Sequence, residues 1–205
     1  QVISTQADKA LFVGAADLDG DGESDVLSAS QYDDKIAWYE NTDGAGSFGA
    51  QQLISTLANS AQSVFAADLD GDGDVDVLSA SDKHDMIAWY ENLDGVGNFG
   101  PQQVISNSAS TAGMIVADVD GDADPDVVKR GSTSGFASIA WYENLDGAGS
   151  FGPQQIITTQ ADTAQMVVAE DVGGDGAVAV LLVSSSDVDT RRPYDHLCAC
   201  SCFAQ

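Results

Sequence analysis

A unit of about 50 residues recurs along this chain almost four times, and this internal repeat limits the possible folds more than any other feature. Four equivalent aspartates, spaced 51, 50 and 53 residues apart, each open an acidic segment: Asp17, Asp68, Asp118 and Asp171. Each complete unit contains a QxIS/T-like opening, an apolar run, an acidic loop, a run of small residues, the motif IAWYEN and a DGxGxFG turn. Because repeats of this length bury their apolar faces against their neighbours, the sequence predicts a row of similar stacked modules.

Each unit is expected to supply about four antiparallel strands. The runs at 64–68 and 114–118 are short, rich in β-branched residues and followed at once by a glycine-rich loop, which favours strands over helices. The segment DVLSAS at 25–30 follows the loop, and IAWYEN follows that segment. The Asp-Gly pairs, such as Asp43-Gly44, indicate hairpin turns because glycine tolerates the positive φ that a tight turn needs.

The motif IAWYEN predicts sheets that are covered on both faces. Along this strand, which begins at Ile36 in the first unit, apolar and aromatic side chains occupy both faces, so neither face is plainly polar. Radially stacked four-stranded sheets cover both faces, and a propeller blade has this repeat length. We therefore expect an all-β fold, a β-propeller or partial propeller of about four blades, three complete and the fourth degenerate. The expected boundaries are 1–51, 52–102 and 103–154 for the complete repeats, 155–186 for the degenerate repeat and 187–205 for an atypical cysteine-containing tail.

The acidic loops have the spacing of a cation site. The segment DLDGDGESD at 17–25 carries carboxylates at its first, third, fifth and ninth positions. Converging carboxylates would repel one another by roughly 4 kcal/mol per close pair at an effective dielectric near 20. Calcium reverses that repulsion and accepts six to eight oxygen ligands in a flexible geometry. The expected ligands are Asp17, Asp19, Asp21 and Asp25 with the carbonyl of Glu23; Asp68, Asp70, Asp72 and Asp76 with that of Asp74; and Asp118, Asp120, Asp122 and Asp126 with that of Asp124.

Two of the four loops depart from this pattern. In the third loop Ala123 replaces the second glycine and Pro125 stiffens the exit, so its geometry is expected to differ. In the fourth loop, 171–179, Gly173 and Ala179 stand where carboxylates are expected. About three calcium sites are therefore expected, with the fourth loop empty or weak.

An EF-hand or a magnesium site fits the acidic loops less well than a calcium site of this repeat. The EF-hand also opens with D-x-D-x-D-G, but its twelfth position is glutamate, whereas Ser28 and Ser79 stand there and the flanks predict strands. Magnesium keeps its waters and rarely fills a cage made only of protein ligands. An acidic turn that binds nothing remains the simplest alternative.

The chain resembles the FG-GAP/VCBS repeat family, which includes the propeller of integrin α subunits and some propeller lectins. The resemblance covers residues 1 to about 186 and rests on the acidic loop combined with a Phe-Gly turn: Phe48-Gly49-Ala50, Phe99-Gly100-Pro101 and Phe151-Gly152-Pro153. It implies a calcium-stabilised propeller, usually extracellular or lumenal and often used for adhesion or glycan binding.

The end of the chain departs from the family pattern. Family propellers usually have about seven blades, and here Arg191, Arg192 and Pro193 stand where Ile and Trp are expected. Since proline cannot donate to a sheet ladder, the last blade is expected to lack its outer strands. The chain is then either part of a longer propeller or meets a partner chain or a second copy at the 171–205 edge.

Charge excludes two classes of partner. With 33 acidic and seven basic side chains, the formal charge of -26 would repel nucleic acid and anionic bilayers. No run of about 18 apolar residues is present, so direct membrane insertion is not expected. Because free calcium is too scarce in the cytosol to fill modest sites, an extracellular, cell-surface or lumenal location is expected.

The remaining chemically active residues support an enzyme weakly. His84 and His196 do not recur, and no Ser-His-Asp order, nucleotide loop or HExxH helix is present. The CxCxC tail could bind a soft metal or form an intermolecular disulfide, although a tail without a defined role is favoured: Cys198, Cys200 and Cys202. The recurring Trp-Tyr pairs could form a sugar platform but fit the core better, and Tyr32 and Phe136 are weak ligand-contact candidates.

The sequence thus favours a non-enzymatic, calcium-dependent module that binds protein or glycan. The first alternative is a structural subunit whose incomplete fourth blade is completed by a partner chain. A glycan-active enzyme is the least favoured, because the periodic carboxylates are already assigned to metal.

Overall fold

The apolar run before each acidic loop forms a strand, and the run after the loop forms the next strand of the same sheet. The computed structural model describes residues 2–83, 85–107, 110–133, 136–159, 164–170, 178–184 and 197–199. The chain divides into two compact units, Gln1–Ala112 and Gly113–Gln205. No helix among the described residues is long and apolar enough to cross a membrane.

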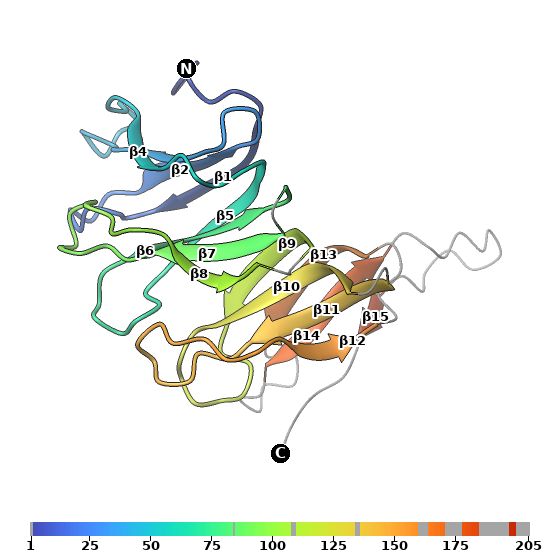
Figure 1. The fold of residues 1–205 in the computed structure, drawn as a ribbon. Helices are drawn as coiled ribbons and strands as arrows, with labels where there is room; N and C mark the ends of the chain where they lie inside the picture. Colours follow the sequence, from blue (N-terminus) through green and yellow to red (C-terminus); the bar gives the residue numbers. More distant parts are fainter. Residues whose placement is uncertain are drawn as a thin grey trace. The chain divides into compact units, whose positions relative to one another are not determined.

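Unit 1 contains two four-stranded antiparallel sheets with the same strand order (Figure 1). Blade 1 consists of β1 (Ala10–Ala16), β2 (Asp25–Ser30), β3 (Lys35–Tyr39) and β4 (Gln52–Ser55). Blade 2 consists of β5 (Ala61–Ala67), β6 (Asp76–Ser81), β7 (Met86–Tyr90) and β8 (Gln103–Ser106). The registers correspond, since Leu27 lies opposite Trp38 in blade 1 and Leu78 lies opposite Trp89 in blade 2.

The third and fourth sheets belong to unit 2, apart from the first residues of β9. Blade 3 consists of β9 (Ser110–Ala117), β10 (Asp126–Thr133), β11 (Phe136–Tyr142) and β12 (Gln155–Thr158). The last sheet consists of β13 (Ala164–Glu170), β14 (Ala179–Ser184) and β15 (Leu197–Ala199), in that order. The predicted all-β fold of three complete blades and a degenerate fourth is confirmed.

The last sheet has one strand more than the sequence pattern indicated. We expected it to lack its outer strands, but β15 pairs with β14, with Leu182 opposite Cys198. The expectation was wrong for the third strand because sheet pairing uses backbone groups, so a tripeptide from the tail can pair without the IAWYEN motif. No fourth strand joins this sheet within the described part of the chain. Arg191, Arg192 and Pro193 lie outside the described residues.

Each sheet is out of phase with the sequence repeat by one strand. The second repeat begins at Gln52, yet β4 pairs with β3 of blade 1, with Gln52 opposite Trp38. In the same way β8 completes blade 2 and β12 completes blade 3. The opening segment of every later repeat is therefore the outer strand of the preceding blade.

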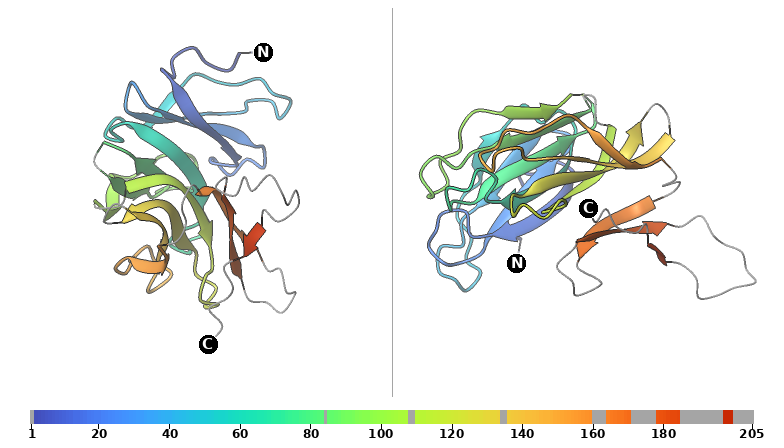
Figure 2. Two further views of the ribbon diagram at one scale, coloured as in Figure 1. Left: turned by 90° about the vertical axis from the view of Figure 1, so that its right-hand side faces the viewer. Right: turned by 90° about the horizontal axis from the view of Figure 1, so that it is seen from below.

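The core of unit 1 lies where blade 2 packs on blade 1. Strand β5 contacts β1, β2 and β3. Figure 2 shows the blue strands of blade 1 next to the teal and green strands of blade 2. Buried side chains from both blades form one cluster, which includes Leu18, Leu27, Trp38, Ala58, Ala61, Val64 and Tyr90. Trp38 is only 2% exposed, so the prediction that it belongs to the core between blades is confirmed, and a sugar platform is excluded at this position.

In unit 2, buried side chains from blade 3 and the last sheet form a second cluster. Its members are Val128, Ile139, Val167 and Val180, and Trp141 packs against them. This tryptophan, like Trp38, therefore serves as core.

Candidate metal centres

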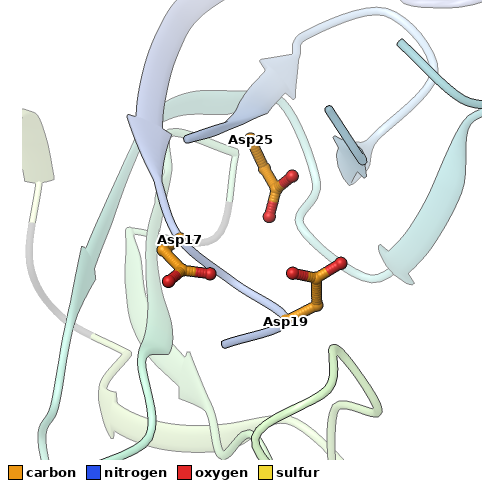
Figure 3. A group of neighbouring side chains, drawn as sticks. All are labelled: Asp17, Asp19 and Asp25. Atoms are coloured by element: carbon orange, nitrogen blue, oxygen red, sulfur yellow. The ribbon is translucent and has the colours of Figure 1, made fainter. Parts of the chain in front are cut away.

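Each acidic loop leaves the end of one strand and enters the next strand of the same blade. The first loop leaves β1 at Ala16 and enters β2 at Asp25, so the ninth position of the motif is held by the sheet. Figure 3 shows the carboxylates of Asp17, Asp19 and Asp25 turned toward one shared space. Each offers an oxygen atom, and these atoms lie within 4.8 Å of one another.

The first aspartate of the loop shapes the backbone. Oδ1 of Asp17 accepts a hydrogen bond from Gly20 N at 2.8 Å, and Oδ2 accepts one from Gly22 N at 2.9 Å. Both glycines have positive φ, 72° and 90°, which side chains other than glycine rarely tolerate. Asp68 holds the second loop in the same way.

The third loop keeps this geometry with an alanine in place of the second glycine. Asp118 accepts hydrogen bonds from Gly121 N at 2.7 Å and from Ala123 N at 3.0 Å. Ala123 has a φ of 78°, a left-handed conformation that costs alanine roughly 1 kcal/mol. The substitution at this position therefore introduces local backbone strain but keeps both hydrogen bonds to the first aspartate.

The ninth aspartate is a buried carboxylate held by two backbone amides. Oδ2 of Asp25 accepts from Leu18 N at 2.9 Å, and Oδ1 accepts from Asn41 N at 2.8 Å. Its counterparts Asp76 and Asp126 are fully buried. Burial raises the pKa of each of these two carboxyl groups to about 6, although the amide bonds act in the opposite direction.

The structure brings together three of the predicted side chains in each loop. The close groups are Asp17, Asp19 and Asp25 in the first loop, Asp68, Asp70 and Asp76 in the second, and Asp118, Asp120 and Asp122 in the third. Asp21 lies outside the first group, and its Oδ1 accepts from Glu23 N at 2.8 Å; Asp72 lies outside the second group and accepts from Asp74 N in the same way. In the third loop Asp126 lies outside the close group and Asp122 belongs to it.

The residue at the seventh position was expected to offer its backbone carbonyl. Its side chain lies against the first glycine of the Asp-Gly turn in the same blade: Glu23 against Gly44, Asp74 against Gly95 and Asp124 against Gly147. A Cβ at these glycines would force the carboxylate to move, and their positive φ disfavours other residues. Residues 171–177 of the fourth loop lie outside the described residues, so its weakness stays a prediction.

Sequence reasoning missed the asparagine that ends each IAWYEN motif. Besides its backbone bond to Asp25, Asn41 donates from Nδ2 to the carbonyl of Ser24 at 3.2 Å and accepts from Gly46 N at 3.2 Å. It therefore joins the acidic loop to the Asp-Gly turn of its own blade. Asn92 and Asn144 make the corresponding backbone bonds to Asp76 and Asp126. Recurrence at the position before the turn was the signal that could have identified this residue.

The glutamate before this asparagine was also missed. Burial is the main cause that raises the pKa of Asp70, and the charge of Glu91 contributes in the same direction. Glu40 acts in this way on Asp19, and Glu143 acts on Asp120. A further negative charge therefore lies within electrostatic reach of each group.

The first acidic loop also contacts blade 2. Asn92 Nδ2 donates to the carbonyl of Leu18 at 2.9 Å, which joins residues 74 positions apart in the sequence. Gly20 lies so close to the carbonyl of Gly95 that an added Cβ would sit 3.0 Å from that oxygen. The order of this loop and the junction between blades 1 and 2 therefore depend on each other.

The other candidate residues gained little support. Tyr32 is exposed, and Lys9 Nζ lies 4.5 Å from its ring centroid, an arrangement that suits a cation–π contact within the chain. His84, His196, Cys200 and Cys202 lie outside the described residues, as do the side chains of Phe136 and Cys198.

Comparisons with known proteins agree with this architecture. A family model described as an FG-GAP-like repeat matches residues 17–79 and 68–128. No curated protein matches the chain.

Several solved structures align with this chain, and those with TM-scores above 0.5 share its fold. A rhamnogalacturonan lyase of Bacillus licheniformis aligns with a TM-score of 0.57 at 13% identity, over 86% of this chain and 41% of that one. A mutant of the NanB sialidase from Streptococcus pneumoniae aligns with a TM-score of 0.54 at 13% identity, over 83% and 27%. The biofilm matrix protein Bap1 of V. cholerae aligns with a TM-score of 0.45 at 22% identity, over 87% and 29%. The chain thus spans well under half the length of these proteins.

Proposed function

Because the chain belongs to the FG-GAP-like repeat family, we propose that it is a calcium-stabilised, non-catalytic β-propeller module that acts outside the cytosol and presents its loops to a protein or glycan. The observation that carries this proposal is the recurrence of a close group of three carboxylates in each of three acidic loops, with the aspartates at the first and third positions of the loop in every group. Repetition on one backbone geometry supports a common ligand for the three loops.

The donor chemistry supports calcium. Each group offers only carboxylate oxygens, hard ligands that suit calcium or magnesium, and magnesium would demand a stricter octahedral shell. Asp17, Asp19 and Asp25 would hold the first ion, with Asp21 and the carbonyl of Glu23 as further ligands. The bound ion would supply positive charge that offsets the repulsion among these carboxylates and the nearby Glu40.

A location outside the cytosol follows from the same chemistry. Extracellular calcium modules typically bind with dissociation constants of about 10⁻⁴ to 10⁻³ M, and cytosolic calcium is too dilute to fill such sites. The high negative charge of the chain also disfavours nucleic acid and anionic membranes as partners.

Binding without turnover is the expected behaviour toward glycans. Two of the matched structures are named as a rhamnogalacturonan lyase and a sialidase, which makes glycans the first ligand class to test. We expect the full chain to retain particular glycans on an array in calcium and to release them in EGTA, with no change in the glycans by mass spectrometry. Cleavage that persists after repurification would contradict the non-catalytic assignment, and absence of any retained glycan would favour a protein ligand.

The affinity for calcium is expected to fall in mild acid. Protons and calcium compete for Asp76 and Asp126, whose pKa values lie at about 6 in the metal-free protein. Calorimetric titration near pH 7 should give about three ions per chain, and binding to the second and third loops should be roughly tenfold weaker near pH 5. Equal affinity at both pH values would contradict the involvement of these two carboxylates.

Without calcium, the same shifts reverse the usual pH dependence of an aspartate. Between about pH 4 and pH 6 the folded chain keeps protons on Asp76 and Asp126 that the unfolded chain has released. The folded state therefore binds more protons, and the stability of the metal-free protein falls as the pH rises through this window. Calcium stabilises the ionised form, so its effect on stability should be larger near pH 7 than near pH 5.

A second candidate function is a structural subunit completed by a partner chain at the 171–205 edge. It is favoured by the last sheet, which has three strands in the described part of the chain where the other blades have four. Self-association of the isolated chain, measured by light scattering, would support this candidate.

A further inference from the structure

One residue, Asn92, connects the acidic loops of blades 1 and 2. Asn92 Nδ2 donates to the carbonyl of Leu18 in the first loop at 2.9 Å, and Leu18 N donates to Oδ2 of Asp25 at 2.9 Å. The backbone N of Asn92 donates to Oδ1 of Asp76 at 2.8 Å. Asp25 and Asp76 belong to the close groups of the first and second loops. Three hydrogen bonds therefore connect a carboxylate of the first group with a carboxylate of the second.

Every group in this connection is shielded from water. Asn92, Leu18 and Asp25 are each 1% exposed, and Asp76 is fully buried. Water cannot easily replace a partner that is lost at such a position, so displacement of one group leaves the next one unsatisfied at a cost in free energy. A change in the position of Leu18 is therefore expected to be felt at Asp76, and the reverse.

The side-chain amide of Asn92 is held at both of its ends. Its Oδ1 accepts a hydrogen bond from Gly97 N at 3.2 Å. Its Nδ2 also donates to the carbonyl of Val75, the residue before Asp76, at 3.2 Å. Rotation of the amide toward another partner would break several of these bonds together. The Leu18 carbonyl and the Asp76 carboxylate are thus positioned by one side chain with little rotational freedom.

Blade 1 contains the same asparagine without a connection of this kind. Asn41 bonds to Asp25 through its backbone N, to the carbonyl of Ser24 through Nδ2 and to Gly46 N through Oδ1, all within its own blade. Among the described residues, no carbonyl of another acidic loop accepts from it. Asn41 therefore serves as an internal control, since it has the bonds within the blade but lacks the bond between loops.

The connection gives a physical reason for coupling between the two sites. Closure of Asp17, Asp19 and Asp25 around an ion would fix Leu18, which lies between the first two and bonds to the third. The Leu18 carbonyl then keeps Asn92 in place, so the second loop pays less conformational entropy to order its own ligands. Repulsion between the two ions opposes this effect, but the three carboxylates around each ion compensate its charge.

We propose that Asn92 couples the calcium sites of blades 1 and 2, so that loading one site raises the affinity of the other about tenfold. The inference rests on the calcium binding proposed above and adds a route between two of its sites. Asn92 acts as a positioning residue, through Leu18 and Asp76. Because linkage is reciprocal, loading the second site raises the affinity of the first by the same factor.

A calcium titration of the unmodified full chain, followed by amide NMR, is the first test. The amides that bond to the first aspartate of each loop report on that loop: Gly20 and Gly22 for the first, Gly71 and Gly73 for the second. For two equal sites, tenfold coupling gives a Hill coefficient of about 1.5 in each loop, whereas independent sites give about 1. This measurement needs no substitution, so it does not depend on the folding of a variant.

Asp70→Asn provides the second test, because it weakens the second site and leaves Asn92 in place. The calcium midpoint of the first loop should rise about threefold, since this site then loads without its partner. In a chain that also carries Asn92→Ala, the same Asp70→Asn substitution should no longer move that midpoint. Asn92→Ala removes the bond to Leu18 but keeps the backbone bond to Asp76.

The matched control is Asn41→Ala, which removes the side-chain bonds of the equivalent asparagine within blade 1. In this background the threefold effect of Asp70→Asn should persist. A Hill coefficient of 1 or less in both loops would overturn the coupling, and a threefold effect that survives Asn92→Ala would overturn the role of Asn92. These results leave calcium binding itself intact. Absence of any calcium response in either loop would instead overturn the proposed function together with this inference.

Discussion

Removal of calcium is expected to lower the unfolding temperature of unit 1 by about 20 °C. At about 10 mM calcium and a dissociation constant near 10⁻⁴ M, each site that binds only the folded state adds about 2.7 kcal/mol. Unit 1 contains the first two groups, Asp17, Asp19 and Asp25 with Asp68, Asp70 and Asp76, so it should lose about 5 kcal/mol in EGTA. Differential scanning calorimetry with calcium, with EGTA and with magnesium measures this shift.

Two substitutions in blade 2 separate the metal site from general charge effects. Asp70→Asn removes a proposed ligand charge but keeps an oxygen for the bond that Oδ1 accepts from Asp72 N at 3.3 Å. Asp94→Asn removes the same charge from the exposed turn, where Oδ1 accepts from Val96 N and Asn98 N. We expect Asp70→Asn to reduce the calcium-dependent shift by about half, because one of two sites is weakened, and Asp94→Asn to leave it unchanged. An identical unfolding curve with and without EGTA would remove the calcium assignment.

The second large effect concerns one substitution made at two equivalent positions. Val64→Asp places a carboxylate in the core between blades 1 and 2 and should destabilise unit 1 by at least about 4 kcal/mol. Val13→Asp makes the same change one repeat earlier, where the side chain is exposed, and should alter stability by no more than about 0.5 kcal/mol. Urea unfolding of both variants, at one calcium concentration, measures the difference.

Each variant is the control for the other, because both add one negative charge to the same position of the repeat. A large loss of stability from Val13→Asp would mean that this side chain is already covered in solution. A small loss from Val64→Asp would contradict the packing of β5 on blade 1.

Most of the successful predictions rest on short motifs that recur at a constant spacing in the sequence. The spacing of Asp17, Asp68 and Asp118 was enough to predict the repeated loops, because a constant period requires each unit to adopt the same local structure. The Asp-Gly turns were also foreseeable, since Gly44, Gly95 and Gly147 all have positive φ. The sequence also indicated that Trp38 belongs to the core, since a large aromatic residue recurring once in each blade is best buried between sheets.

Long-range relations were not predictable from the pattern. The one-strand offset between repeat and sheet could not be predicted. Pairing of β4 with β3 depends on which backbones lie close together, and the repeat period does not specify this. The role of Asn92 requires contacts with Leu18 and Asp76, which lie far from it in the chain or on another strand. The tail segment that pairs as β15 carries no strand signal of the earlier repeats, so sequence comparison between units could not identify it.

The phase offset between repeat and sheet has a consequence for how such a chain can lengthen. A duplicated stretch of 51 residues, inserted at Gln52, would bring three strands of its own and would inherit its fourth strand from the original segment that follows it. Every added module would therefore share a sheet with the next module along the same continuous chain. Growth by duplication then leaves no sheet incomplete inside the array. Only the two terminal modules need a capping element that covers their open faces or edges.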